Sequence, residues 1–246
     1  MNRVTLEQRV TADTRSRVYW LLARLFGTRP EPELLERLAA TPPSRAADAD
    51  GVVSALVHLH DTLAREAPQA LAERLAPEHT RLFGGLRRGY GPPPPFESVY
   101  RRSPNPAEVA LEVMAAYEAA GFGAMDEALG PPDTVSAELE FMALACFRES
   151  EAWAQGDAQE ALAWQERQRT FLDEHLLAWL PALCDALRAA TREPYFRHVA
   201  DLAEATCRAD RDDLSPPASS PSSPTATTMP STGNTRSCSS CRSAAT

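Results

Sequence analysis

Two segments of the 246-residue chain could together hold an extended peptide. The first, residues 91–100, is Gly-Pro-Pro-Pro-Pro-Phe-Glu-Ser-Val-Tyr, and its prolines favour a rigid, extended backbone. The second, residues 132–142, begins with Pro-Asp-Thr and carries acids among apolar residues. A carboxylate can bind an arginine side chain through two parallel hydrogen bonds, and an apolar groove can take a hydrophobic stretch. These residue types predict a peptide-binding site rather than a catalytic one.

The same segments also fit a purely structural role. The proline run could cross the domain and anchor it at Phe96 and Tyr100, while Asp133 caps the helix that follows it. The residue types alone leave both interpretations open.

No other group of residues predicts catalysis, a metal site or a cofactor. Cys238 and Cys241 have metal-ligand spacing, but zinc needs about two more ligands nearby. The five histidines do not cluster, and the chain has no lysine to complete a phosphate-binding loop. Glu138 and Glu140 diverge on a helix, and His175 is expected to be a hydrogen-bonded interface residue. We predict no catalytic or metal-binding residues and no cofactor, with a small-molecule-binding helical enzyme as the weaker alternative.

The elements that must position these segments are predicted to be helices. Apolar residues recur at helical spacing through most of the chain, and three helices have capping residues at their start: Asn105, Asp133 and Asp157. Pro181 predicts a break or kink. A long proline-rich loop, Gly84–Arg102, interrupts the helical pattern.

The predicted fold is therefore all-α, one helical domain of about nine to eleven helices over residues 1–214. Residues 215–246 are rich in Ser, Thr and Pro and hold too few apolar residues to pack, so we expect a disordered tail.

The formal net charge is −9, and because the tail holds only Arg236 and Arg242 as charged residues, the acidic excess lies in the helical part. An acidic protein repels nucleic acid and anionic membranes and favours a basic partner. No stretch approaches the roughly 20 apolar residues of a membrane span, and the N-terminus lacks an apolar signal region. We expect a cytoplasmic protein that binds no nucleic acid and does not insert stably into membranes.

Four short motifs, in this order, resemble the TorD/DmsD family of cytoplasmic chaperones for molybdoenzymes exported by the twin-arginine pathway. The motifs are Glu78–Phe83, Pro94–Tyr100, Pro132–Met142 and Phe171–Pro181. The resemblance covers roughly residues 15–205. Thr134 departs from the family pattern, which has His at this position after Pro-Asp.

The resemblance implies an all-helical chaperone without catalytic turnover. Such a protein binds the twin-arginine signal peptide of a molybdoenzyme catalytic subunit of the DMSO-reductase-like superfamily. It assists molybdenum cofactor insertion and prevents premature export. The alternative is a nitrate-reductase-assembly type of chaperone for a non-exported subunit; either could be a monomer or a homodimer. The expected peptide-binding residues are Pro132, Asp133, Thr134, Glu138, Phe96, Tyr100 and Phe141.

Overall fold

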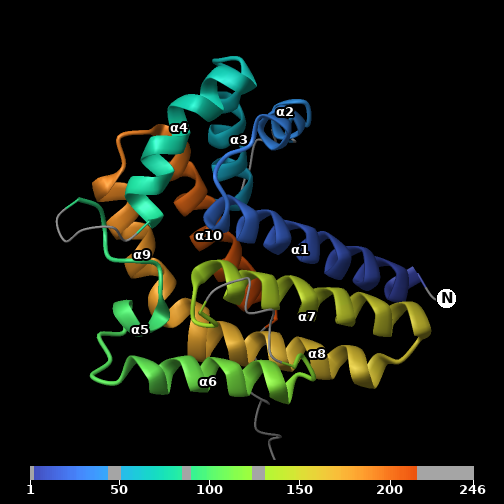
Figure 1. Ribbon diagram of the computed structural model, residues 1–246. Coiled ribbons are helices and arrows are strands. Elements are labelled where there is room, and N and C mark those ends of the chain that lie inside the picture. The colour runs from blue at the N-terminus through green and yellow to red at the C-terminus, as the bar shows by residue number, and fades with distance from the viewer. Residues whose placement is uncertain (1–2, 44–50, 85–89, 124–130, 215–246) are drawn as a thin grey trace, which may run out of the picture. The chain divides into compact units, whose positions relative to one another are not determined.

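The computed structural model describes residues 3–43, 51–84, 90–123 and 131–214. These residues lie in one compact unit, Met1–Ser215, and form ten α-helices, one π-helical segment and one isolated β-bridge (Figure 1). The all-α prediction is confirmed for this part of the chain; the predicted tail lies outside it. The helices are α1 (Arg3–Gly27), α2 (Pro32–Ala39), α3 (Gly51–Leu63), α4 (Pro68–Phe83), α5 (Glu97–Tyr100), α6 (Pro106–Ala119), α7 (Val135–Gln155), α8 (Ala158–Phe171), the π-helix η2 (Leu172–Leu176), α9 (Leu177–Ala190) and α10 (Pro194–Asp213).

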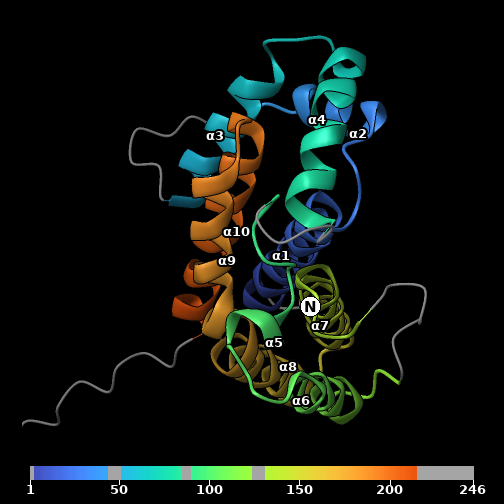
Figure 2. The same ribbon diagram turned by 60° about the vertical axis from the view of Figure 1, so that its left-hand side comes forward.

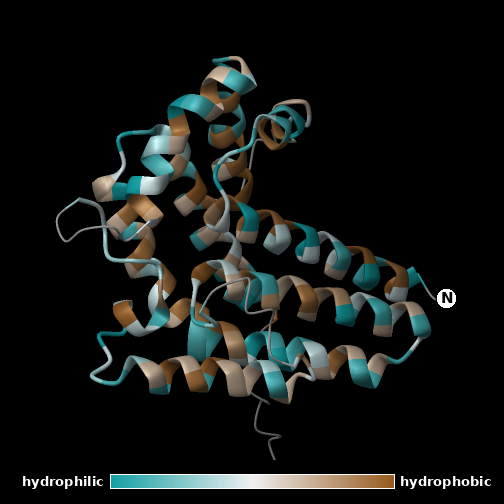
Figure 3. Ribbon diagram, viewed as in Figure 1, coloured by the Kyte–Doolittle hydropathy of each residue, from teal (hydrophilic) through white to brown (hydrophobic). Residues whose placement is uncertain are grey.

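Helix α7 lies between α1, which runs antiparallel to it, and α8 (Figures 1 and 2). The Ser16 hydroxyl donates to the Ala143 carbonyl at 2.8 Å, and Gly27 at the end of α1 meets Ser136 at the start of α7. Hydrophobic and hydrophilic residues alternate along both helices (Figure 3), as expected when one face of each helix is buried. The end of α1 therefore lies beside the start of α7.

A second group of helices packs around α10, which contacts α3 and α9, while α2 packs on α4. Phe83 at the end of α4 joins the two groups, because its ring lies 5.8 Å from Phe26 of α1 and 6.0 Å from Phe196 of α10. Aromatic contacts of this kind fix the relative position of three helices beside the proline-rich loop.

Two predicted helix caps have different outcomes. Asp157 caps α8 as predicted and accepts a hydrogen bond from the Glu160 N–H at 3.0 Å. The predicted cap of α7 by Asp133 is wrong, because Thr134 is the N-cap and its Oγ1 accepts from the Ala137 N–H at 3.2 Å. The Asp133 carboxylate is directed toward the proline-rich loop instead.

Of the break or kink predicted at Pro181, the break is wrong, because α9 continues through this residue. The irregular segment is η2, which ends immediately before α9 and whose existence the sequence did not reveal. Proline cannot donate to the carbonyl one turn earlier and its ring crowds that carbonyl. A π-helical turn next to this position has the looser hydrogen-bond spacing that accommodates such crowding.

Candidate functional site

The proline-rich loop is tied to the start of α7 by backbone hydrogen bonds. Phe96 and Thr134 form the isolated antiparallel bridge. The Glu97 N–H donates to the Asp133 carbonyl at 2.8 Å, and the Val135 N–H donates to the Pro95 carbonyl at 3.1 Å. The two segments that the sequence singled out therefore lie in contact.

Asp133 and Pro132 hold this junction from the α7 side. One carboxylate oxygen of Asp133 accepts from the Ser98 N–H at 3.2 Å and so caps α5. The Pro132 carbonyl accepts from the Tyr117 hydroxyl of α6 at 2.9 Å. These contacts connect the loop, α6 and α7.

Tyr100 anchors the other end of the loop. Its hydroxyl donates to the Pro93 carbonyl at 3.1 Å, and its ring lies 5.7 Å from Trp179 of α9. Burial raises the pKa of Tyr100 to about 12, so the hydroxyl stays protonated and remains a donor.

Glu138 belongs to a buried polar network beneath α5. Trp179 Nε1 donates to Glu138 Oε2 at 3.0 Å. Burial and the negative charge of Glu97 raise the pKa of Glu138 well above its ordinary value, which favours the neutral carboxylic acid. Its Oε1 accepts no hydrogen bond and can carry the proton that Glu138 donates to Glu97. Glu97 also accepts from Arg101 Nη1 at 2.8 Å and lies 3.1 Å from His175 Nδ1.

The burial of Asp133 and Glu138 changes the role that the sequence predicted for them. Asp133 is 4% exposed and Glu138 is 0% exposed, and both have partners inside the protein. In this structure the Glu138 side chain has no exposed surface and that of Asp133 has almost none, so both carboxylates are directed at groups inside the protein. Their contacts hold α5 and the proline-rich loop in place.

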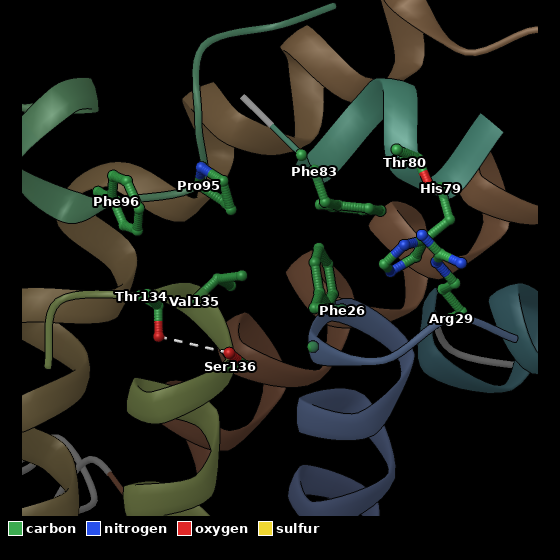
Figure 4. Close-up of a pocket in the computed structure, with 12 residues that line it drawn as sticks. Phe26, Arg29, His79, Thr80, Phe83, Pro95, Phe96, Thr134, Val135 and Ser136 are labelled. Carbon is green, nitrogen blue, oxygen red and sulfur yellow. Dashed lines mark hydrogen bonds between the residues drawn. The ribbon is translucent and has the colours of Figure 1, made fainter. Parts of the chain in front are cut away.

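A cavity of about 310 Å³ lies next to the bridge between Phe96 and Thr134 (Figure 4). Its walls come from α1, α4, the proline-rich loop and the start of α7, and most of them are apolar. The apolar side chains are Phe26, Phe83, Pro95, Phe96 and Val135, and the polar ones are Arg29, His79, Thr80, Thr134 and Ser136. This cavity, named the bridge cavity below, can hold an apolar side chain of a peptide.

The polar groups of the bridge cavity are neutral or basic. Burial lowers the pKa of His79, so its ring is neutral at pH 7. Arg29 forms no ion pair with another residue of the described part of the chain. The sequence did not identify Phe26, His79 or Arg29 as site residues; the helical spacing of Phe26 indicated only burial.

Phe141 lies apart from the bridge cavity, although the sequence grouped it with Phe96. Its ring packs 4.9 Å from Tyr117 and 4.3 Å from Phe171, and it lines a different cavity, between α6 and α8. Of the seven predicted residues, Phe96 and Thr134 line the bridge cavity, while Pro132, Asp133, Glu138 and Tyr100 support its walls.

The described ranges contain neither a group of metal ligands nor a membrane-spanning helix. There, no three His, Cys, Asp or Glu side chains are grouped so that they could hold a metal ion. Within the same ranges, no helix has the length and apolar character to cross a bilayer.

Comparison with known proteins gives two findings. Residues 45–185 match the family model of the nitrate reductase delta subunit. The chain is 31% identical over 121 residues to the perchlorate reductase assembly chaperone protein of Dechloromonas aromatica (strain RCB). That alignment covers 48% of this chain and 52% of the relative, so the chain spans about half the length of the curated relative that it matches.

Proposed function

Because the chain belongs to the nitrate reductase delta subunit family, which includes the TorD-type chaperones, we propose that it is the assembly chaperone of a molybdoenzyme. It binds the twin-arginine signal peptide of a catalytic subunit of the DMSO-reductase-like superfamily before that subunit has its cofactor. Binding in the cytoplasm assists molybdenum cofactor insertion and prevents premature export. This family consists of assembly chaperones, so the alternative of a small-molecule-binding enzyme loses its support.

The observation that carries the proposal is the bridge cavity. Its apolar walls suit the hydrophobic stretch of a signal peptide. The backbone at the adjacent bridge is extended, so an extended peptide can lie alongside it. Asp133 and Glu138 act on binding indirectly, by holding Phe96 and Thr134 at the wall.

The second candidate is a chaperone for a molybdoenzyme subunit that is not exported. The family name favours it, because the matched model is that of the nitrate reductase delta subunit. The two candidates differ in the partner: only the first requires a leader with two arginines. Replacing both arginines of the partner by glutamine tests this, because loss of binding supports the first candidate and unchanged binding supports the second.

Co-purification from the native host identifies the partner. A cofactor-free molybdoenzyme precursor bound to this chain is the expected result. Normal maturation of every molybdoenzyme in a deletion strain contradicts the proposal.

Blocking the bridge cavity is expected to abolish binding of the partner's N-terminal peptide. In Thr80→Phe, a bulky ring enters the cavity from α4, and we expect affinity to fall at least about tenfold by isothermal titration calorimetry. Thr14→Phe is the matched control, because Thr14 and Thr80 each donate to a carbonyl four residues earlier, and Thr14 is exposed on α1. Equal affinity for the two variants, with both folded, excludes the bridge cavity as the binding site.

A further inference from the structure

His79, on the α4 wall of the bridge cavity, has a ring nitrogen without a hydrogen-bond partner. The residue is 8% exposed, and its Nε2 is buried and bonded to no group in the part of the chain that the structure describes. Figure 4 shows the His79 side chain among the residues that line the cavity. An unpaired polar atom that is buried in this way is costly, so it favours a ligand that supplies the missing hydrogen bond.

The contact of His79 with α1 decides what that ligand must supply. The Phe26 carbonyl accepts a hydrogen bond from the ring, and because Nε2 has no partner, the donating nitrogen is Nδ1. This carbonyl is open to a side chain because the residue one turn later is Pro30, which has no N–H. Burial lowers the pKa of His79, and the bond to Phe26 offsets this only in part. The ring is therefore neutral, and its Nε2 can only accept a hydrogen bond.

The other polar groups of the bridge cavity favour a donor that can also accept. The hydroxyls are already engaged, because Thr80 donates to a carbonyl of its own helix at 3.1 Å and those of Thr134 and Ser136 lie 3.3 Å apart. Arg29 is exposed and forms no ion pair within the described ranges. Its positive charge opposes protonation of the nearby His79 ring and repels a cationic ligand. A hydroxyl suits both groups, because it donates to Nε2 and accepts from a guanidinium N–H.

The walls around this acceptor are aromatic. The centroid of the Phe83 ring lies 4.9 Å from that of His79 and 5.8 Å from that of Phe26. Phe96 adds a further ring on the side of the bridge. Aromatic rings pack favourably against one another in offset or edge-to-face arrangements. A cavity of about 310 Å³ has room for an aromatic side chain, whereas serine or threonine leaves most of it unfilled.

We propose that the bridge cavity binds a tyrosine side chain of the partner's peptide. The tyrosine ring lies between the phenylalanines, and its hydroxyl donates to His79 Nε2. The exposed Arg29 side chain moves aside as the ring enters and then donates to the hydroxyl oxygen. Phenylalanine at the same place fills the cavity but leaves Nε2 without a donor. This inference rests on the proposed function, because it names the side chain of the partner that the bridge cavity selects.

Titration with N-acetyltyrosine amide tests the site without the partner. The full-length protein, with isotope-labelled histidine, is titrated while the ring nitrogens of His79 are followed by NMR, and the spectrum of His79→Asn assigns them. We expect a saturable shift of Nε2 with the tyrosine amide and at least about tenfold weaker binding of N-acetylphenylalanine amide. No shift of Nε2, or equal binding of the two amides, overturns the inference.

His79→Asn removes the acceptor and keeps the contact with α1. An asparagine amide can donate to the Phe26 carbonyl from the position of Nδ1, but it has no group at the position of Nε2. We expect this variant to lose the preference for the tyrosine amide. His58→Asn, at an exposed histidine of α3, is the matched control and keeps the preference. An equal preference in the two variants contradicts the inference, and if His79→Asn does not fold, the titration of the unaltered protein decides.

The partner's peptide separates this inference from the proposed function. If the peptide binds the unaltered protein and His79→Asn equally well, the proposed assembly role survives and the tyrosine site does not. If the tyrosine amide binds and the peptide does not, the tyrosine site survives and the proposed role fails.

Discussion

Glu138 is a residue whose chemistry in this fold differs from its usual form. A glutamate in water is ionised at neutral pH, but here burial and the neighbouring Glu97 raise the pKa of its carboxyl. A neutral Glu138 can donate to Glu97 while accepting from Trp179, so three elements (α5, α7 and α9) depend on one proton. The candidate site is built on this neutral acid rather than on an exposed anion.

Glu138→Gln tests that protonation state. The unfolded chain releases the Glu138 proton above about pH 4.5, whereas the folded protein keeps it. The contribution of Glu138 to the free energy of unfolding is therefore complete below about pH 4.5, and it falls as the pH rises toward the raised pKa of the folded state. Glutamine keeps a donor and does not titrate. We expect Glu138→Gln to gain stability relative to wild type by up to about 1.4 kcal/mol for each pH unit of that window.

Urea unfolding at about pH 5 and about pH 8 measures this difference. Glu36→Gln serves as the exposed control and should show no such trend. A wild-type minus Glu138→Gln difference that stays constant with pH contradicts a protonated Glu138.

At the scale of elements, the ends of the helices position the site. Thr134 begins α7 and closes the bridge with Phe96, while η2 precedes α9 and carries His175. The opposite end of α7 stops at Gly156, whose φ of 77° is in the left-handed region. A glycine takes this conformation without the steric cost that a Cβ adds.

Gly156→Ala is expected to lower stability by about 1 kcal/mol, because alanine is strained at this φ even though space around it is open. Gly51→Ala, at the first position of α3, is the matched control. A Cβ there meets Ala205 at an ordinary 3.6 Å and no positive φ opposes it, so stability should not fall. Thermal unfolding of the two variants measures the stability that each has lost. Equal losses of stability contradict the assignment of strain to position 156.

At the scale of the whole described unit, one buried ionic cluster joins the beginning of the chain to its last helix. Arg15 of α1 donates to Glu149 of α7 at 3.0 Å and to Asp210 of α10 at 2.9 Å. Gln168 of α8 completes the cluster, and Tyr19 donates to Asp210 at 2.8 Å. Four helices therefore share one guanidinium.

Arg15→Ala is expected to destabilise the protein by about 3–5 kcal/mol, because it leaves two buried carboxylates without their cation. Arg148→Ala removes an exposed pair with Glu151 and should cost less than about 1 kcal/mol. Chemical denaturation of both variants measures the contrast. A cost for Arg15→Ala no larger than that for Arg148→Ala would show that the cluster does not hold the helices together.

The helices and the proline-rich interruption between them could be predicted because both depend on local residue types. Asp157 caps a helix through its own side chain and the next turn, and prolines stiffen a loop wherever they occur. The exchange of roles between Asp133 and Thr134 could not be predicted. Either side chain can cap a helix, and the choice depends on the hydrogen bond between the Ser98 N–H and Asp133, 35 residues away in the chain.

The sequence by itself determined the all-α fold of the described part and the helix start at Asp157. Each of these depends on side chains within a few turns of one another. Only the tertiary structure decided which groups face the cavities. Burial withdrew Asp133 and Glu138 from solvent and brought Phe26, His79 and Phe83 to the bridge cavity, because exposure and pKa depend on neighbours from distant helices.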